Sequence, residues 1–176
     1  VRHDHAFQVP RPDLADALGT RNVCTGCHQE KTSAWAAQVI SDQYGPSRTR
    51  GPHWARAIDS ARRGEATALE SLLELTEAGA APDIVRATAV KLAARYGAGA
   101  SGILLRASQD SSPLVRNAAA WAYSYGPDDE KLKGLPALLS DPYRSVRAEA
   151  GRGLASFPLE VLGQEVSAQR DRALSE

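Results

Sequence analysis

The chain has 176 residues, a length that fits one domain or a small pair of domains. Lys and Arg total 21 and Asp and Glu total 21, so no basic surplus predicts binding to nucleic acid or to an anionic membrane surface. No apolar run approaches the roughly 20 residues that span a bilayer. Strand-forming residues are sparse and Ala, Leu, Glu, Arg and Gln are plentiful, so we expect an almost all-α chain without a membrane span.

The beginning of the chain is expected to form an arm followed by a helix. Residues 1–23 are rich in turn-forming residues, and Pro12 marks the start of a short helix. Residues 29–44 place apolar side chains with helical periodicity and end at a Gly-Pro pair, which predicts an amphipathic helix.

A loop rich in Gly, Pro and Arg follows at residues 45–52. Beyond this loop we expect two helices, at residues 53–63 and 67–78, separated near Gly64. The loop therefore delivers His53 at or near the start of a helix.

The rest of the chain repeats itself with a period of about 30 residues. A Pro, a Val-Arg pair and small Ala residues recur in the same order in segments that begin at Pro82, Pro113 and Pro142. A short Leu-rich helix precedes each segment, so each unit is predicted to be a helical hairpin, whose Ala residues let neighbouring hairpins approach closely. The pattern over residues 69–157 resembles the HEAT family of repeats, which implies a stacked array of α-hairpins.

Each repeat carries an arginine directly after its valine, at Arg86, Arg116 and Arg147. A guanidinium at this position is able to contact a ligand or to bond the turn of an adjacent repeat. We interpret the three arginines as ladder residues that join adjacent repeats.

The five residues from Cys24 to His28 have the C-x-x-C-H spacing of covalent haem attachment. Two thiols one helical turn apart add to the two vinyl groups on one edge of the porphyrin, and the adjacent imidazole then reaches the iron. We therefore predict one haem c bound by Cys24, Cys27 and His28. Two alternatives remain open: a redox dithiol, which favours a strand before the motif, and half of a zinc site, which needs ligands from the three other histidines.

The second axial ligand of the iron is predicted by elimination. The chain contains no Met, so a Met ligand is excluded. His53 is the preferred ligand because a Gly/Pro-rich loop is able to fold its imidazole back over the ring, with His5 as the alternative distal ligand and His3 after it. We expect a bis-histidine, six-coordinate haem of low potential, with His28 and His53 on the iron.

The segments from Arg2 to Leu14 and from Asn22 to Lys31 resemble the last-haem region of multihaem c-type cytochromes that carry helical repeats at their C-terminus. The resemblance, which is to the lineage of cytochrome c nitrite reductase, implies that His5 binds a haem attached to another segment or another chain. This chain holds one attachment motif where those relatives hold several. It also has no motif for a catalytic Lys-ligated haem, so nitrite reduction is not implied.

These observations divide the chain into a haem-binding segment, residues 1–66, and HEAT-like helical repeats, residues 67–176. The expected function is electron transfer, with the repeats as a docking or assembly surface for redox partner proteins or other cytochrome subunits. An electron carrier is favoured over an enzyme. The alternatives are a haem enzyme or gas sensor with an open distal position, and a non-haem interaction scaffold with a redox dithiol.

The location of the protein is predicted from the motif. Bacteria attach haem to this motif outside the cytoplasm, so we expect a periplasmic or extracellular protein. The chain begins at Val1 without a charged-then-apolar leader, so we also expect it to be processed or cut from a longer one.

Overall fold

The computed structural model describes residues 10–45 and 53–176, and in these ranges every regular element is a helix. This confirms the all-α prediction. None of the described helices combines the length and the apolar character needed to cross a bilayer. The helices are α1 (Pro12–Leu18), α2 (Val23–Cys27), α3 (Ser33–Tyr44), α4 (Trp54–Arg63), α5 (Ala68–Thr76), α6 (Asp83–Ala93), η2 (Ala94–Ala100), α7 (Ser101–Ser108), α8 (Pro113–Ser124), α9 (Asp128–Gly134), η3 (Pro136–Ser140), α10 (Arg144–Leu154) and α11 (Leu159–Ser175).

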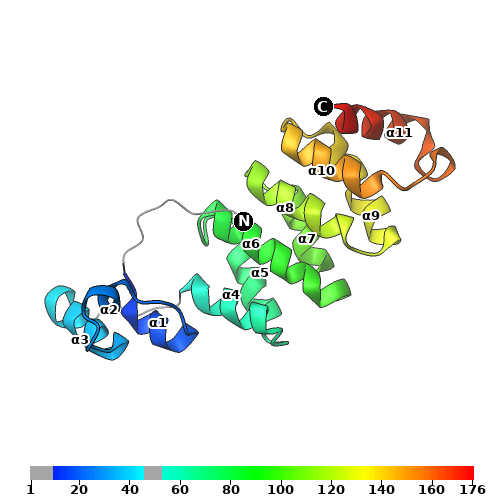
Figure 1. Ribbon diagram of the computed structural model, residues 1–176. Coiled ribbons are helices and arrows are strands. Elements are labelled where there is room, and N and C mark those ends of the chain that lie inside the picture. Colours follow the sequence, from blue (N-terminus) through cyan, green and yellow to red (C-terminus); the bar gives the residue numbers. More distant parts are fainter. Residues whose placement is uncertain (1–9, 46–52) are drawn as a thin grey trace. The chain divides into compact units, whose positions relative to one another are not determined.

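The chain divides into two compact units, residues 1–59 and 60–176. The boundary between them falls inside α4. Figure 1 shows α1 to α3 in blue and cyan, and α5 to α11 in green through red.

In the first unit, α1 packs against α3 over a small core of Leu14, Ala15 and Ala36. Helix α1 begins at Pro12, whose missing N–H costs nothing in a first turn, and ends at Gly19 in the left-handed conformation with φ 61°. This core is too small to cover α2, so the cysteine-bearing helix stays largely at the surface.

The start of α3 differs from the sequence prediction of residues 29–44. Thr32 caps α3, and its Oγ1 accepts the Trp35 N–H at 3.1 Å. The segment from His28 to Lys31 forms a turn in which the Lys31 N–H donates to the His28 carbonyl at 3.0 Å. The helix therefore begins at Ser33. The Thr32 side chain accepts the Trp35 N–H, which in a longer helix would donate to a backbone carbonyl of the preceding turn.

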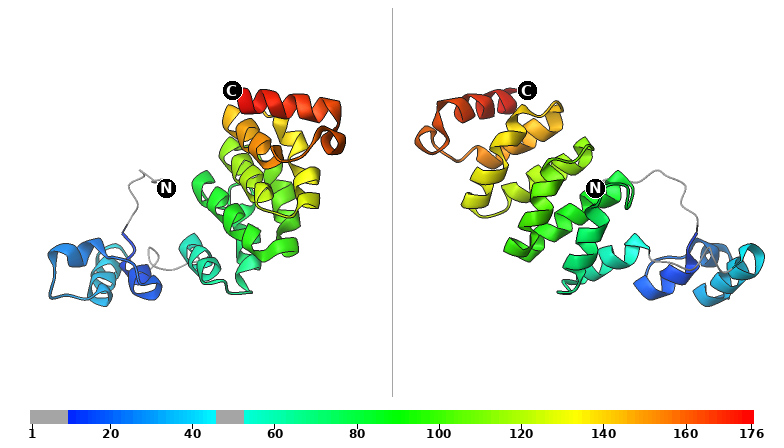
Figure 2. Two further views of the ribbon diagram at one scale, coloured as in Figure 1. Left: turned by 45° about the vertical axis from the view of Figure 1, so that its right-hand side comes forward. Right: turned by 180° about the vertical axis from the view of Figure 1, so that it is seen from behind.

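The second unit is a stack of hairpins, which we call the repeat array (α5 to α11). The first two hairpins are α5 with α6 and α7 with α8; the third pairs α9 and η3 with α10, and α11 packs on α10 at the end. The second helices α6, α8 and α10 lie side by side in successive views (Figure 1, Figure 2). The predicted repeats are therefore present in the fold, with the same phase and order.

The core of the repeat array consists of aliphatic side chains at positions that recur in each repeat. Val85, Val115 and Val146 are all buried, and the small residues between them let α8 and α10 approach closely. Gly153 of α10 shows this, because a Cβ there would lie 2.4 Å from Ser124 Oγ of α8 and 2.5 Å from Leu135 Cδ1. Only glycine fits at this position without displacing its neighbours.

Candidate functional site

The first candidate site is the segment that carries the two cysteines. Helix α2 begins at Asn22, whose Oδ1 accepts the Cys24 N–H at 3.0 Å. Cys24 and Cys27 are three residues apart on this helix, so their Sγ atoms leave the same side of it. Neither is in a disulfide; Cys24 is half-buried and Cys27 is exposed. The two thiols are thus adjacent and accessible, as the predicted attachment requires.

His28 follows directly as the C-cap of α2, and its N–H donates to the Cys24 carbonyl at 3.0 Å. The exposed imidazole packs on Trp35 of α3, with ring centroids 5.1 Å apart. The Lys31 ammonium lies 5.9 Å from the same indole. The residue that follows the second cysteine therefore rests its imidazole on the indole of Trp35.

His53 lies at the start of α4, as predicted, and acts there as a helix cap. Its Nδ1 accepts the Ala55 N–H at 3.2 Å, and its ring packs on Trp54 with centroids 4.7 Å apart. Burial lowers the pKa of His53, the charge of Arg11 lowers it further, and Asp13 partly opposes them. The lowered pKa and the hydrogen bond that Nδ1 accepts both favour the neutral imidazole.

The cap has a consequence for ligation by His53. A neutral imidazole that accepts at Nδ1 carries its proton on Nε2. To bind a metal through Nε2, His53 must give up the bond to Ala55 or lose that proton as well. The remaining predicted ligands, His5 and His3, lie outside the described residues.

The donor set determines which groups the first site fits. Two accessible thiols one turn apart and a neighbouring imidazole suit covalent attachment of a haem along one edge. Across residues 10–45 and 53–176, no three His, Cys, Asp or Glu side chains gather as a metal-binding group. The zinc alternative therefore has no additional ligands among the described side chains.

The second candidate site is a chain of charged contacts along one edge of the repeat array, which we call the acid–arginine ladder. Arg86 donates to Asp110 at 2.6 and 2.8 Å, and Arg116 donates to Asp141 at 2.5 and 3.1 Å. Each bond joins the second helix of one hairpin to the turn before the second helix of the next. The ladder consists of Arg86, Asp110, Arg116, Asp141, Arg147 and Glu176.

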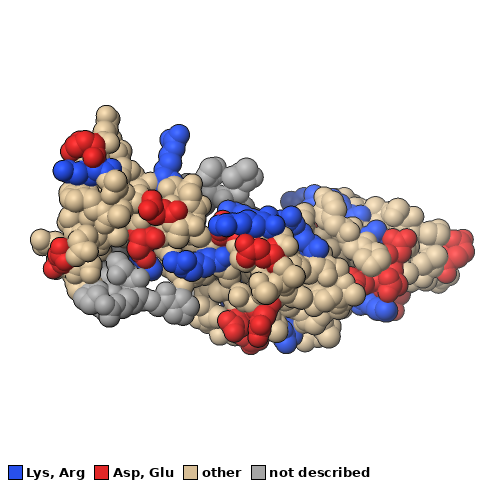
Figure 3. All heavy atoms as spheres, turned by 90° about the horizontal axis from the view of Figure 1, so that it is seen from below, with Lys and Arg blue, Asp and Glu red and all other residues tan. Residues whose placement is uncertain are grey.

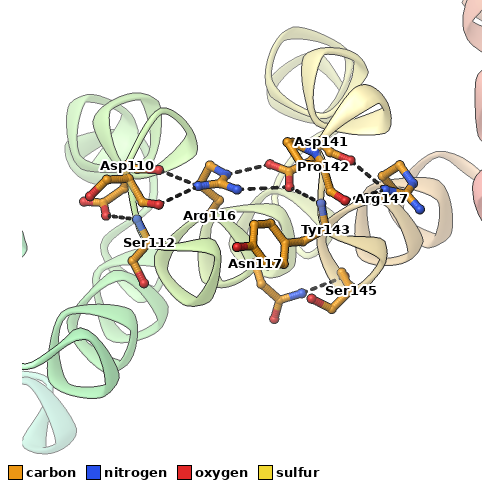
Figure 4. A network of polar contacts seen from close by, with 10 residues as sticks. Asp110, Ser112, Arg116, Asn117, Asp141, Pro142, Tyr143, Ser145 and Arg147 are labelled. Carbon is orange, nitrogen blue, oxygen red and sulfur yellow. Dashed lines mark hydrogen bonds and ion pairs between the residues drawn. The ribbon is translucent and has the colours of Figure 1, made fainter.

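Figure 4 shows that two ladder arginines, Arg116 and Arg147, also bond the backbone of their own turns. Arg116 Nη1 donates to the carbonyls of Asp110 and Ser111, and Arg147 Nη1 donates to those of Asp141 and Pro142. The carboxylates accept backbone N–H groups in turn, as Asp141 does from Tyr143 at 2.8 Å. The prediction that these arginines join adjacent repeats is confirmed for Arg86 and Arg116, whereas Arg147 bonds its own turn and Glu176 of the terminal helix.

The ladder carboxylates are ionised well below neutral pH. Burial alone would raise the pKa of Asp110, but the Arg86 guanidinium and the Ser112 N–H lower it below its usual value. Burial and the hydrogen bond from Arg116 compete in the same way at Asp141, and its pKa is also lowered. Sequence reasoning missed these acids, although each stands six residues before a ladder arginine, at 110 and 116 and at 141 and 147.

The repeat array also has an open groove of about 500 Å³ between its first helices. Leu69 and Leu73 of α5, Ile103 and Arg106 of α7 and Gly99 of η2 contribute to its lining. No predicted site residue lies in this groove.

The fold and the ladder define an α-helical repeat protein. Residues 69–155 match the family model described as HEAT repeats. No curated protein and no solved structure matches the chain. The predicted HEAT resemblance of residues 69–157 therefore has independent support.

The comparisons correct the other resemblance. The identification of the chain with multihaem c-type cytochromes is wrong as a family assignment, because the match describes HEAT repeats and covers the repeats, not the cysteine motif. The physical reason is the small number of constraints in that region. The attachment motif fixes three of five residues, and its flanks are a turn-rich arm and a short helix, which many unrelated chains contain.

Proposed function

We propose that the chain is a docking scaffold for partner proteins, with the repeat array as its binding part. The observation that carries this proposal is the acid–arginine ladder. It holds the second helices in one register, because the ion pairs of Arg86 with Asp110 and of Arg116 with Asp141, both largely buried, bond each hairpin to the next. The result is a continuous surface of fixed shape, which suits recognition of an extended partner.

The scaffold proposal is tested by site-specific photo-cross-linking in the natural host of the protein. A benzophenone amino acid replaces Tyr125 on the second-helix side or Leu105 of α7, whose side chains are 75% and 57% exposed. We expect an adduct of one reproducible mass at one or both positions. The control carries Val115→Asp, which places a charge at a fully buried site and should abolish both fold and adduct. Absence of any adduct, or adducts that survive in the control, would contradict the scaffold.

We propose, as a second function, that Cys24 and Cys27 bind a haem covalently and that His28 is its proximal iron ligand. The support is the geometry of α2, which presents two accessible thiols and the next imidazole on one short segment. When bound, such a group supplies one-electron redox chemistry. Trp35 would hold the His28 ring, because it already packs on that imidazole. This proposal rests on the motif and not on a family relationship.

The covalent attachment implies an extracytoplasmic location and a partner that donates or accepts electrons. The test is the intact mass of the protein purified from its host, together with haem staining after denaturation. We expect one haem's mass above that of the chain, and loss of the stain in the Cys24→Ser, Cys27→Ser double variant. A colourless protein in which both thiols titrate would contradict haem attachment and favour the redox dithiol.

A further inference from the structure

The last rung of the acid–arginine ladder differs from the other two in its surroundings. In the first two rungs Arg86 and Arg116 meet turn aspartates, and neither rung has an excess of positive charge. Arg147 stands at one end of the network in Figure 4, and its acid is Glu176, directly after α11. This last pair lines a pocket, which we call the end pocket.

The end pocket is a half-open cavity of about 280 Å³ between η3, α10 and α11. A water molecule occupies about 30 Å³ in the liquid, so the pocket has room for a small polyatomic ion. Polar side chains from all three elements line it, among them Ser140, Arg147, Gln169, Arg172 and Glu176. The pocket therefore lies wholly within the repeat array and is polar in character.

Arg147 uses nearly all of its donors inside the protein. Its Nε–H donates to Glu176 at 3.0 Å, and its Nη2 donates to the same carboxylate. Its Nη1 donates to the carbonyls of Asp141 and Pro142. A guanidinium has five N–H groups, so Arg147 keeps one for a further partner and otherwise gives the pocket its charge.

Arg172 lines the same pocket with its donors unused. Its side chain is exposed, and it forms no ion pair with any side chain in the described parts of the chain. Arg144, one turn before Arg147 on α10, is also exposed and pairs with none of the described carboxylates. The hydrogen bond from Arg147 lowers the pKa of Glu176, desolvation opposes this shift, and the charges of Arg147 and Arg144 lower the pKa further. The charge of Arg144 therefore reaches the pocket.

Three guanidinium groups thus act on one carboxylate, which leaves an excess of two positive charges at the end pocket. Neighbouring acids do not cancel this excess, because Asp141 and Asp171 are each paired with another arginine. Glu165 lies two turns before Arg172, about 10 Å away along the helix. The chain as a whole is neutral, and Figure 3 shows basic and acidic side chains mixed over the face that it presents. The excess is therefore a local feature of the end pocket.

We propose that the end pocket binds a phosphoryl group, whose charge of about −2 near neutral pH matches the excess. Arg172 donates to two phosphoryl oxygens through its planar fork, and the remaining N–H of Arg147 donates to a third. Arg144 adds its charge from the rim, and Glu176 opposes the ligand and limits its affinity. A carboxylate ligand, with one charge, would neutralise only half of the excess. The phosphoryl group belongs to a phosphorylated partner or to free phosphate, and the site depends on neither function proposed above.

The test is isothermal titration calorimetry of the full chain with inorganic phosphate, at constant ionic strength and about pH 8, where phosphate is a dianion. We expect saturable binding of one phosphate per chain. Acetate, a monoanion, should bind at least about tenfold more weakly. A peptide that carries phosphoserine and its unphosphorylated copy form the second arm. Tighter binding of the phosphopeptide than of phosphate assigns the pocket to a phosphorylated partner, and equal or weaker binding assigns it to the free ion.

Matched variants assign the binding to this pocket. Arg172→Gln should weaken phosphate binding roughly tenfold or more, because it removes the guanidinium whose donors are unused. Glu176→Gln should tighten binding about threefold or more, because it removes the carboxylate that repels the ligand, and a gain of this kind does not arise from a damaged fold. The control is Arg106→Gln on α7, an exposed arginine outside the pocket, which should bind within about twofold of the parent chain.

Four results would overturn the proposal. These are no saturable binding of either phosphate or the phosphopeptide, acetate binding as tight as that of phosphate, equal loss in Arg172→Gln and Arg106→Gln, and no gain in Glu176→Gln. The photo-cross-links at Tyr125 and Leu105 and the haem stain test the two proposed functions independently of this pocket.

Discussion

Removal of one acid from the ladder should destabilise the repeat array far more than removal of an exposed acid. The perturbation is Asp141→Ala. Asp141 is buried, and its carboxylate accepts two hydrogen bonds from Arg116 and one from the Tyr143 N–H. The alanine side chain supplies no acceptor for these donors. The change leaves the Arg116 guanidinium, whose side chain is 13% exposed, without its carboxylate.

The magnitude follows from the contacts that remain. Breaking a buried ion pair by removal of one partner costs about 3–5 kcal/mol. Arg116 keeps its bonds to the Asp110 and Ser111 carbonyls, so we expect a loss of about 3 kcal/mol in the free energy of unfolding, at the lower end of that range. For a chain of this size this corresponds to a fall in Tm of roughly 6–12 °C.

The assay is urea unfolding followed by circular dichroism, with Asp129→Ala as the matched control. Asp129 pairs with Lys133 at 3.1 Å, and both side chains are more than half exposed, so its loss should cost less than about 1 kcal/mol. Adding Arg116→Met to Asp141→Ala should recover part of the stability, because no unpaired guanidinium then remains. A difference of less than about 1 kcal/mol between the two aspartate variants would refute the ladder as a stabilising element.

The remaining predictions concern acid stability, packing and His53. The pKa values of Asp110 and Asp141 are lowered in the folded chain. Their contribution to the free energy of unfolding is therefore present above the unfolded pKa of about 4 and is lost as the pH falls through the folded pKa values. Urea unfolding at a series of decreasing pH values should show this loss, and a free energy of unfolding that stays constant below about pH 4 would contradict it. Gly153→Ala should lower the free energy of unfolding by about 1–3 kcal/mol, because the new Cβ meets Ser124 and Leu135. The control, Gly102→Ala on α7, has open space around it and should be neutral or stabilising by up to about 1 kcal/mol. Equal effects of the two variants in thermal melts would argue against close packing at Gly153. His53→Ala should remove the cap of α4 and lower the free energy of unfolding by about 1 kcal/mol, and His53→Asn should restore the cap. A haem spectrum that both variants alter equally would instead assign His53 to the iron.

The sequence predicted the fold of the second unit well because its signals are redundant. The buried valine, the arginine after it and the small alanines recur in three repeats, so an error at one position is corrected by the others. The start of α3 was less predictable, since the apolar periodicity does not show that Thr32 caps the helix by accepting the Trp35 N–H. Asp110 and Asp141 of the ladder lie in turns, where hydrophobic periodicity gives no information.

The candidate sites were predicted unevenly for a similar reason. The spacing of Cys24, Cys27 and His28 predicts their adjacency, because three residues span about one turn of helix. The second axial ligand of an iron depends on side chains that tertiary packing brings together. The order of residues in the sequence did not reveal that the His53 imidazole accepts a hydrogen bond from Ala55 of its own helix. The resemblance to multihaem cytochromes was wrong where it depended on one short motif, and the resemblance to HEAT repeats is supported where it depends on a long periodic pattern.

The ladder also determines how the array responds to mechanical tension. Two rungs each connect a hairpin to the next and the last connects α10 to the end of α11, so a force applied at Glu176 loads the bond between Arg147 and Glu176 before any other rung. Once that bond opens, the load passes to the pair formed by Arg116 and Asp141, and then to that of Arg86 and Asp110. Stretching in an optical trap would thus release the hairpins singly from one end, each freeing about 30 residues and adding about 100 Å of contour length.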